Sequence, residues 1–311
     1  MGELLFASRW LIAAVAAAVL LAGCGTSPEV TPAQASAGAP AGDDEGSVVY
    51  AVGDIADCGK RAPGEAQAAR TAELLKTTTG PILALGDIAY PKGSHTDFAT
   101  CFDPIWGELK PRILPVPGNH EYLTPGAGPY YAYFGAAAGE PGRGYYSTDI
   151  GTWHIVALNS NIGAAAGSAQ VQWLRVDLAA SRAKCTLAFW HHPVFTSSPR
   201  GNNAAMLDVW RVLYDAGVEV VLNGHEHSYE RFAPQTPRGE PDHARGIREF
   251  VVGTGGATAG FFGAIDANSE SRERAALGVL RLRLKADGYA WQFLSVAGYK
   301  FSDRGEGRCH N

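Results

Sequence analysis

The chain has 311 residues, of which 46% are hydrophobic and 18% charged, a composition typical of a globular protein long enough to bury a large core. The net charge of −5 and the lack of a lysine- and arginine-rich cluster exclude a surface built to neutralise a phosphate backbone, so we expect no nucleic-acid partner. The 38 glycines and 18 prolines indicate many turns and loops.

Residues 1–24 have the features of an export signal. Arg9 precedes an apolar run over residues 10–22, which is too short to span a bilayer as a helix. The run ends in Leu21-Ala22-Gly23-Cys24, which resembles a bacterial lipoprotein box. We therefore expect an exported protein held at the cell membrane, outside the cytoplasm, by a lipid anchor on Cys24. The alternative is an ordinary secretory signal and a secreted protein.

Residues 25–46 are rich in alanine, glycine, proline and serine and then become acidic, which predicts a disordered linker before a folded domain at 47–311. In that domain, short apolar runs predict buried strands at 48–53, 82–85, 113–116, 186–190, 218–222 and 248–252. Helices are predicted at 63–78, 168–182 and 203–216, with Ser168 as an N-cap and Gly217 as a stop. Hairpins are predicted at 145–158 and 277–296. Early strand–helix alternation with late hairpins predicts an α/β (α+β) fold with mixed sheets.

Once Cys24 is set aside, four cysteines remain, which is typical of an exported protein with two disulfides. Three pairings are possible. We favour Cys58–Cys101, which would join the loops after two Gly-Asp motifs, together with Cys185–Cys309, which would attach the C-terminal tail to a strand. Buried free thiols are the alternative.

Polar clusters follow the predicted strands, at the edge where an α/β sheet presents its chemistry. They are Gly53-Asp54, Gly86-Asp87-Ile88-Ala89-Tyr90, Gly118-Asn119-His120-Glu121, His191-His192-Pro193 and Gly224-His225-Glu226-His227. Each alone is more commonly a turn former or a packed side chain, but their recurrence predicts one site. The carboxylate, amide and imidazole donors, without thiolates, suit Zn, Fe or Mn, and one carboxylate can bridge two such ions.

The order GD, GDxxY, GNHE, HxP and GHxH resembles that of calcineurin-like metallophosphoesterases, and most closely that of purple acid phosphatases. This resemblance implies a four-layer αββα sandwich with two mixed sheets and a pair of metal ions. It assigns Asp54, Asp87, Tyr90 and His227 to the first metal, and Asn119, His191, His225 and the bridging Asp87 to the second. It also implies that His120 lies over the substrate as a general acid or phosphate-stabilising group.

Two departures from the family pattern bear on the metals and the substrate. Ala56 stands where most members have a histidine, while Tyr90 offers a phenolate that would favour Fe(III) at the first site, with Zn, Fe or Mn at the second. Purple acid phosphatases carry further histidines after the HxP motif; here the segment is 197–203, in which Arg200 or Asn202 is a candidate phosphate contact. His192 is left open between a structural role and a role in supporting the ligands.

The resemblance implies an enzyme that hydrolyses phosphomonoesters through attack by a metal-bridging hydroxide, with a phosphate ester as its substrate. A phosphodiesterase on the same scaffold is one alternative. A surface lipoprotein that binds a partner without turnover is the other.

Overall fold

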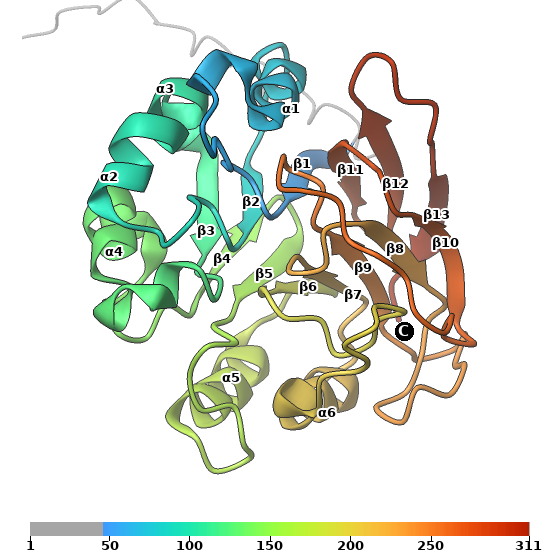
Figure 1. Cartoon of the computed structure of the whole chain (residues 1–311). Coiled ribbons are helices and arrows are strands. Elements are labelled where there is room, and N and C mark those ends of the chain that lie inside the picture. The colour runs from blue at the N-terminus through green and yellow to red at the C-terminus, as the bar shows by residue number, and fades with distance from the viewer. Residues whose placement is uncertain (1–45, 311) are drawn as a thin grey trace, which may run out of the picture. The chain divides into compact units, whose positions relative to one another are not determined.

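The computed structural model describes residues 46–310 (Figure 1). The predicted signal at 1–24, the Cys24 anchor and nearly all of the predicted linker at 25–46 lie outside these residues and stay predictions. Within the described part of the chain, every helix is too short or too polar to cross a lipid bilayer.

The first of two mixed sheets has six strands in the order β13-β12-β11-β1-β2-β3. Strands β1, β2 and β3 run parallel, whereas β11 pairs antiparallel with β1, β12 with β11, and β13 with β12. The strands are β1 Ser47–Val52, β2 Ile82–Leu85, β3 Ile113–Val116, β11 Gly278–Lys285, β12 Gly288–Ser295 and β13 Arg304–Arg308.

The second sheet has seven strands in the order β10-β8-β9-β7-β6-β5-β4. Its parallel centre consists of β5, β6, β7 and β9, and antiparallel strands flank that centre. The strands are β4 Tyr146–Ile150, β5 Trp153–Ala157, β6 Cys185–Phe189, β7 Val220–Asn223, β8 Tyr229–Phe232, β9 Arg248–Val252 and β10 Ser269–Glu273.

Helices cover the outer faces of both sheets (Figure 1). Those beside the first sheet are α1 Gln67–Lys76, α2 His95–Asp97, α3 Asp103–Trp106 and α4 Gly128–Phe134, and those beside the second are α5 Ala169–Ala180 and α6 Leu207–Asp215. Alternate residues of β1 enter different layers: Tyr50 and Val52 pack with α1, whereas Val49 and Ala51 pack between the sheets. A third core layer joins α5 and α6 to the second sheet. The αββα sandwich implied by the motifs is confirmed.

Most predicted elements are present, and the differences have local causes. The helix predicted at 63–78 is divided, because Ala66 is extended between a 3₁₀ turn at Pro63–Glu65 and α1. The helix predicted at 203–216 likewise begins as a 3₁₀ turn at Ala204–Met206 before α6. Ser168 does cap α5, since its hydroxyl accepts the Val171 N–H at 3.3 Å.

Several elements were not predicted, because they lack an apolar period. The edge strands β10 and β13 have the sequences SESRE and RGEGR, and they are held by pairing with their neighbours. The helical stretch from α2 to Arg112 changes pitch, through a π-helical turn at Phe98–Phe102 and a 3₁₀ segment at Gly107–Arg112. Pro104 and Pro111 lie within this stretch, and prolines normally indicate a break in a helix, so the sequence does not predict it.

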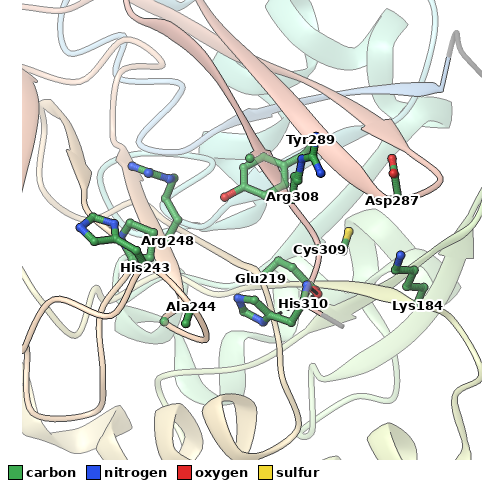
Figure 2. A pocket seen from close by; sticks show the side chains of 13 residues that line it. Lys184, Glu219, His243, Ala244, Arg248, Asp287, Tyr289, Arg308, Cys309 and His310 are labelled. Carbon is green, nitrogen blue, oxygen red and sulfur yellow. Dashed lines mark hydrogen bonds and ion pairs between the residues drawn. The ribbon is translucent and has the colours of Figure 1, made fainter.

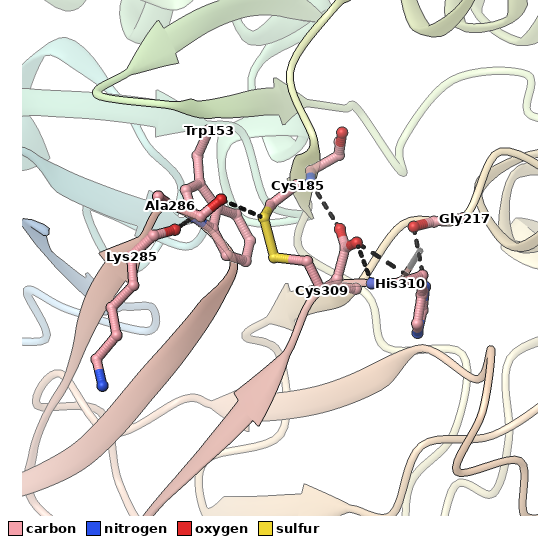
Figure 3. The surroundings of a disulfide bond; sticks show 9 residues. Trp153, Cys185, Gly217, Lys285, Ala286, Cys309 and His310 are labelled. Carbon is pink, nitrogen blue, oxygen red and sulfur yellow. Dashed lines mark hydrogen bonds and ion pairs between the residues drawn. A yellow bond between two sulfur atoms is a disulfide. The ribbon is translucent and has the colours of Figure 1, made fainter. Parts of the chain in front are cut away.

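Both favoured disulfides are present, Cys58–Cys101 and Cys185–Cys309, with Cα atoms 5.9 and 5.6 Å apart. The second joins the first residue of β6 to the segment after β13, so it ties the two sheets together (Figure 3). Next to it, the His310 N–H donates to the Glu219 carboxylate at 3.1 Å, which holds the tail against the residue before β7.

Candidate metal centre

The predicted ligands all lie just after strands and meet at the carboxyl edge of the two sheets. Asp54 follows β1, Asp87 and Tyr90 follow β2, Asn119 follows β3, His191 follows β6, and His225 and His227 follow β7. The backbone is strained here, because a positive φ disfavours residues other than glycine. Of the four such residues in the described chain, three are Asp54, Asp87 and His225, with φ of 58°, 49° and 70°.

A first group of candidate metal-ligating atoms, called the first donor group below, surrounds the Tyr90 hydroxyl. The hydroxyl oxygen lies 2.9 Å from Asp54 Oδ1, 3.3 Å from Asp87 Oδ2 and 3.0 Å from His227 Nε2. His227 Nε2 is also 3.2 Å from Asp54 Oδ1. Because His227 Nδ1 donates to the Thr258 carbonyl at 2.7 Å, Nε2 is free to offer its lone pair to a metal.

A second group of donors surrounds His191 Nε2. This atom lies 3.2 Å from Asp87 Oδ2, 3.1 Å from Asn119 Oδ1 and 3.2 Å from His225 Nδ1. His191 Nδ1 donates to the Leu85 carbonyl at 2.8 Å, which again leaves Nε2 facing the other donors. Asp87 therefore belongs to both groups, and the donor atoms of Asp54, Asp87 and His191 lie within 4.8 Å of one another.

The electrostatics of this cluster fit bound cations. Although burial raises the pKa of Asp87, the His191 and His120 imidazoles hold that pKa well below its usual range. Burial and the Asp54 and Asp87 carboxylates raise the pKa of the Tyr90 phenol well above its usual range. A phenolate at this position therefore requires an added positive charge, which a metal ion supplies.

His120 and Glu121 have different places beside the donors. The His120 N–H donates to Asp87 Oδ1 at 2.8 Å, and the ring stacks at a tilt on Tyr90, with 4.4 Å between centroids. Glu121 is fully buried and accepts N–H groups from Asp87, Ile88, Ala89 and Gly118 at 2.8–3.2 Å. Glu121 thus holds together the two loops that carry Asp87 and Asn119, and its carboxylate is turned to backbone rather than to the donors.

A profile of the calcineurin-like phosphoesterase family matches residues 47–229, which is more than half of the chain. The chain belongs to this family. Membership implies a binuclear metal centre, and the two donor groups that share Asp87 have the oxygen and nitrogen atoms that such a centre needs.

Named relatives of this chain include purple acid phosphatases. Purple acid phosphatase 15 of Arabidopsis thaliana is 27% identical over 195 residues, which cover 51% of this chain and 37% of that protein. The probable inactive purple acid phosphatase 9 of the same plant is 27% identical over 193 residues, 48% of this chain and 29% of that protein.

Among solved structures, purple acid phosphatase PPD1 from yellow lupin (Lupinus luteus) seeds matches with a TM-score of 0.72 and 18% identity, over 84% of this chain and 53% of that one. This likeness shows the fold. The chain spans less than half the length of the two curated relatives above.

Two further side chains touch the second donor group. His192 lies beside His225, with 4.4 Å between ring centroids, and its Nδ1 is 2.8 Å from the Ser160 hydroxyl. Burial and the neighbouring His191 lower the pKa of His192 to about 3, so it is neutral at physiological pH. Arg200 Nη1 lies 2.8 Å from His225 Nε2. The only signals of these contacts in the sequence are the His191-His192 pair and the lone arginine after the HxP motif.

Two cavities lie at opposite ends of the second sheet. One of about 260 Å³ adjoins the metal centre and is lined by Arg200, Asn202, His225 and Glu226, among others. A larger one of about 380 Å³ is lined by Lys184, Glu219 and Arg248, which lie at the amino ends of β6, β7 and β9 (Figure 2). None of the predicted metal ligands lines the larger cavity.

Proposed function

We propose that this chain hydrolyses phosphate monoesters at a pair of bound metal ions. One observation carries the proposal: Asp87 Oδ2 lies 3.3 Å from the Tyr90 hydroxyl and 3.2 Å from His191 Nε2, so one carboxylate belongs to both donor groups. Bridging by a carboxylate suits hydrolytic sites that hold two cations roughly 3.5–4 Å apart.

In this proposal the first metal is held by Asp54, Asp87, Tyr90 and His227, and the second by Asp87, Asn119, His191 and His225. The carboxylates and the phenolate are hard anionic donors that favour Fe(III) at the first position, and the imidazoles and amide suit Zn, Fe or Mn at the second. When bound, the cations would supply hydroxide near neutral pH and neutralise phosphoryl oxygens.

His120 is the proposed general acid. Its Nδ1 donates to the Pro91 carbonyl at 2.6 Å, which fixes the ring and leaves Nε2 on the partly exposed side of the site. Nε2 is 3.8 Å from Asp87 Oδ2. A proton on Nε2 would then be available to the leaving-group oxygen of an ester, or would stabilise the phosphate.

The test is Asp87→Asn, with Asp215→Asn at the exposed last residue of α6 as a matched control. Loss of the shared carboxylate is expected to reduce hydrolysis of 4-nitrophenyl phosphate by about a thousandfold or more, because several kcal/mol of transition-state stabilisation depend on the cations. Circular dichroism and metal analysis accompany the assay. An active Asp87→Asn protein with its full metal content would refute the proposal.

Two further outcomes separate the alternatives. A higher kcat/KM for bis(4-nitrophenyl) phosphate than for the monoester would identify a phosphodiesterase. Stoichiometric metal with hydrolysis of neither ester would identify a non-catalytic binding protein, the case suggested by the name of one Arabidopsis relative.

The identity of the first metal is tested by Tyr90→Phe. A tyrosinate–Fe(III) pair absorbs visible light through charge transfer, so the iron-loaded wild type is expected to be coloured and the variant to lose that band. A variant with an unchanged spectrum would show that Tyr90 is not an iron ligand.

We also propose that the protein is exported and anchored through Cys24. The two disulfides support export, because such bonds persist in oxidising compartments. Cys24→Ser is expected to move the protein from the membrane fraction to the soluble exported fraction; retention of the variant in membranes would contradict lipidation.

A further inference from the structure

Arg200 is a cation at the edge of the second donor group with few partners of its own. Its Nη1 lies 2.8 Å from His225 Nε2 and 3.8 Å from Glu226 Oε1, and the side chain is 64% exposed. It lines the 260 Å³ cavity together with His225 and Asn202. A solvent-facing guanidinium therefore lies in the cavity through which a substrate would approach the candidate metal ligands.

The contact between Arg200 and His225 depends on the histidine tautomer. His225 Nδ1 is the ring atom that faces the other donors, at 3.2 Å from His191 Nε2. If Nδ1 offers its lone pair there, Nε2 must carry the ring proton. An arginine has only N–H donors, so it cannot hydrogen-bond to a protonated Nε2. In that state Arg200 has no acceptor on His225 and is free to bind an anion.

The loop beneath Arg200 is firmly held. The Ser197 N–H donates to Glu230 Oε2 at 2.9 Å, and its hydroxyl donates to Glu230 Oε1. The Thr196 N–H donates to Asn202 Oδ1 at 2.9 Å, which closes the loop around Arg200. Because the base of the loop is fixed, only the side chain of Arg200 must move to meet a ligand.

We propose that Arg200 binds the phosphate group of the substrate and favours a dianionic monoester over a monoanionic diester. A guanidinium matches two phosphate oxygens with a pair of parallel N–H donors. Its attraction to a dianion is about twice that to a monoanion at equal distance. The inference rests on the proposed function, since it assumes that phosphate lies against the donor group of His225.

The experiment compares Arg200→Gln and Arg200→Lys with Arg182→Gln, which removes an exposed arginine that follows α5. Calorimetric titration of the metal-loaded proteins with inorganic phosphate is expected to show about 10–100-fold weaker binding for Arg200→Gln, the loss of one charge-assisted hydrogen-bonding group. Arg200→Lys should recover part of the affinity, and Arg182→Gln should match the wild type. Metal content should be equal in all four proteins.

Steady-state assays then test the choice of ester. Arg200→Gln is expected to lower kcat/KM for 4-nitrophenyl phosphate by the factor seen in the titration, and for bis(4-nitrophenyl) phosphate by a smaller factor. Equal losses on the two esters would overturn the selection for dianions.

The outcomes separate this inference from the proposed function. Unchanged phosphate affinity in Arg200→Gln, or loss of its metal, would overturn the role of Arg200 even if the wild type is an active phosphatase. Arg200-dependent phosphate binding by a wild type that hydrolyses neither ester would support the role of Arg200 and defeat the proposed function.

Discussion

A buried carboxylate lies beside each end of the seven-stranded sheet, Glu219 at its amino end and Asp87, from the loop after β2 of the other sheet, at its carboxyl end, but the two have different surroundings. At the amino end Glu219 accepts backbone N–H groups from Thr186 at 2.7 Å and His310 at 3.1 Å. At the carboxyl end the shared Asp87 faces the side chains of His191 and Tyr90. Burial raises the pKa of Glu219 to about 7, whereas imidazoles hold that of Asp87 low. A buried carboxylate that accepts only backbone N–H groups has a structural role. A buried carboxylate that faces imidazole and phenol side chains indicates a metal-binding or catalytic site.

The largest expected effect is a loss of stability at the amino end of the seven-stranded sheet that leaves metal binding at the carboxyl end unchanged. Replacing Cys185 and Cys309 by serine removes a link between residues 124 apart in sequence, so the free energy of unfolding should fall by about 4–5 kcal/mol. Metal content in native buffer should not change, because the bond lies at the amino end. Urea denaturation and metal analysis measure both quantities. If the variant unfolds like the wild type, the disulfide does not stabilise the fold. If it loses its metals while folded, the two ends are not independent.

The next effect concerns pH at the amino end. The Glu219 pKa is raised from 4.5 to about 7, so between these values the folded state keeps a proton that the unfolded state releases. Stability due to Glu219 is therefore present below pH 4.5 and is lost as pH rises to about 7, by roughly 3 kcal/mol. The difference in unfolding free energy between wild type and Glu219→Gln should change by this amount between pH 4 and pH 8. A constant difference would contradict it.

The smallest expected effect concerns Glu121, which supports the loops of the metal ligands at the carboxyl end. Glu121→Gln places an amide NH₂ against backbone N–H groups that the carboxylate now accepts, so the loops carrying Asp87 and Asn119 should shift. Metal affinity is expected to fall by about 10–100-fold, as for other groups that orient ligands from behind. Competition with a chelator measures this, and Glu108→Gln on an exposed segment is the control. Full affinity in Glu121→Gln would show that this carboxylate does not position the ligands.

The parts of the fold that could be predicted are those with buried, apolar strands. Residues 82–85 and 113–116 were predicted with their observed limits, because both faces of these strands are covered. Strand β8 was not predicted, because Glu230 in its middle reads as polar; in the folded chain Glu230 is buried and accepts hydrogen bonds from Ser197. Such a partner, far away in sequence, leaves no trace in a local pattern.

The ordered motifs led to the residues of the metal centre, because each donor directly follows a strand and strand ends converge. The motifs do not reveal the contacts between loops. Arg200 and His225 are 25 residues apart in the sequence. No local pattern predicts that Arg200 Nη1 lies 2.8 Å from His225 Nε2. The contact between Arg200 and His225, from which the proposed role of Arg200 is inferred, is therefore visible only in the structure.

The pairing of β1 has a consequence for dividing this protein into parts. The matched family region ends at residue 229, yet β1 lies between β2 and β11, and β11 begins at Gly278. The backbone around Asp54 is also fixed from beyond residue 229, since the Gly53 N–H donates to Val252 and the Ala257 N–H donates to Asp54. A fragment truncated after residue 229 would expose the apolar side of β1 and release the loop of a metal ligand. The part that matches the family is therefore not expected to fold by itself. The last 80 or so residues (roughly a typical small domain's length) support a site to which they add no proposed ligand.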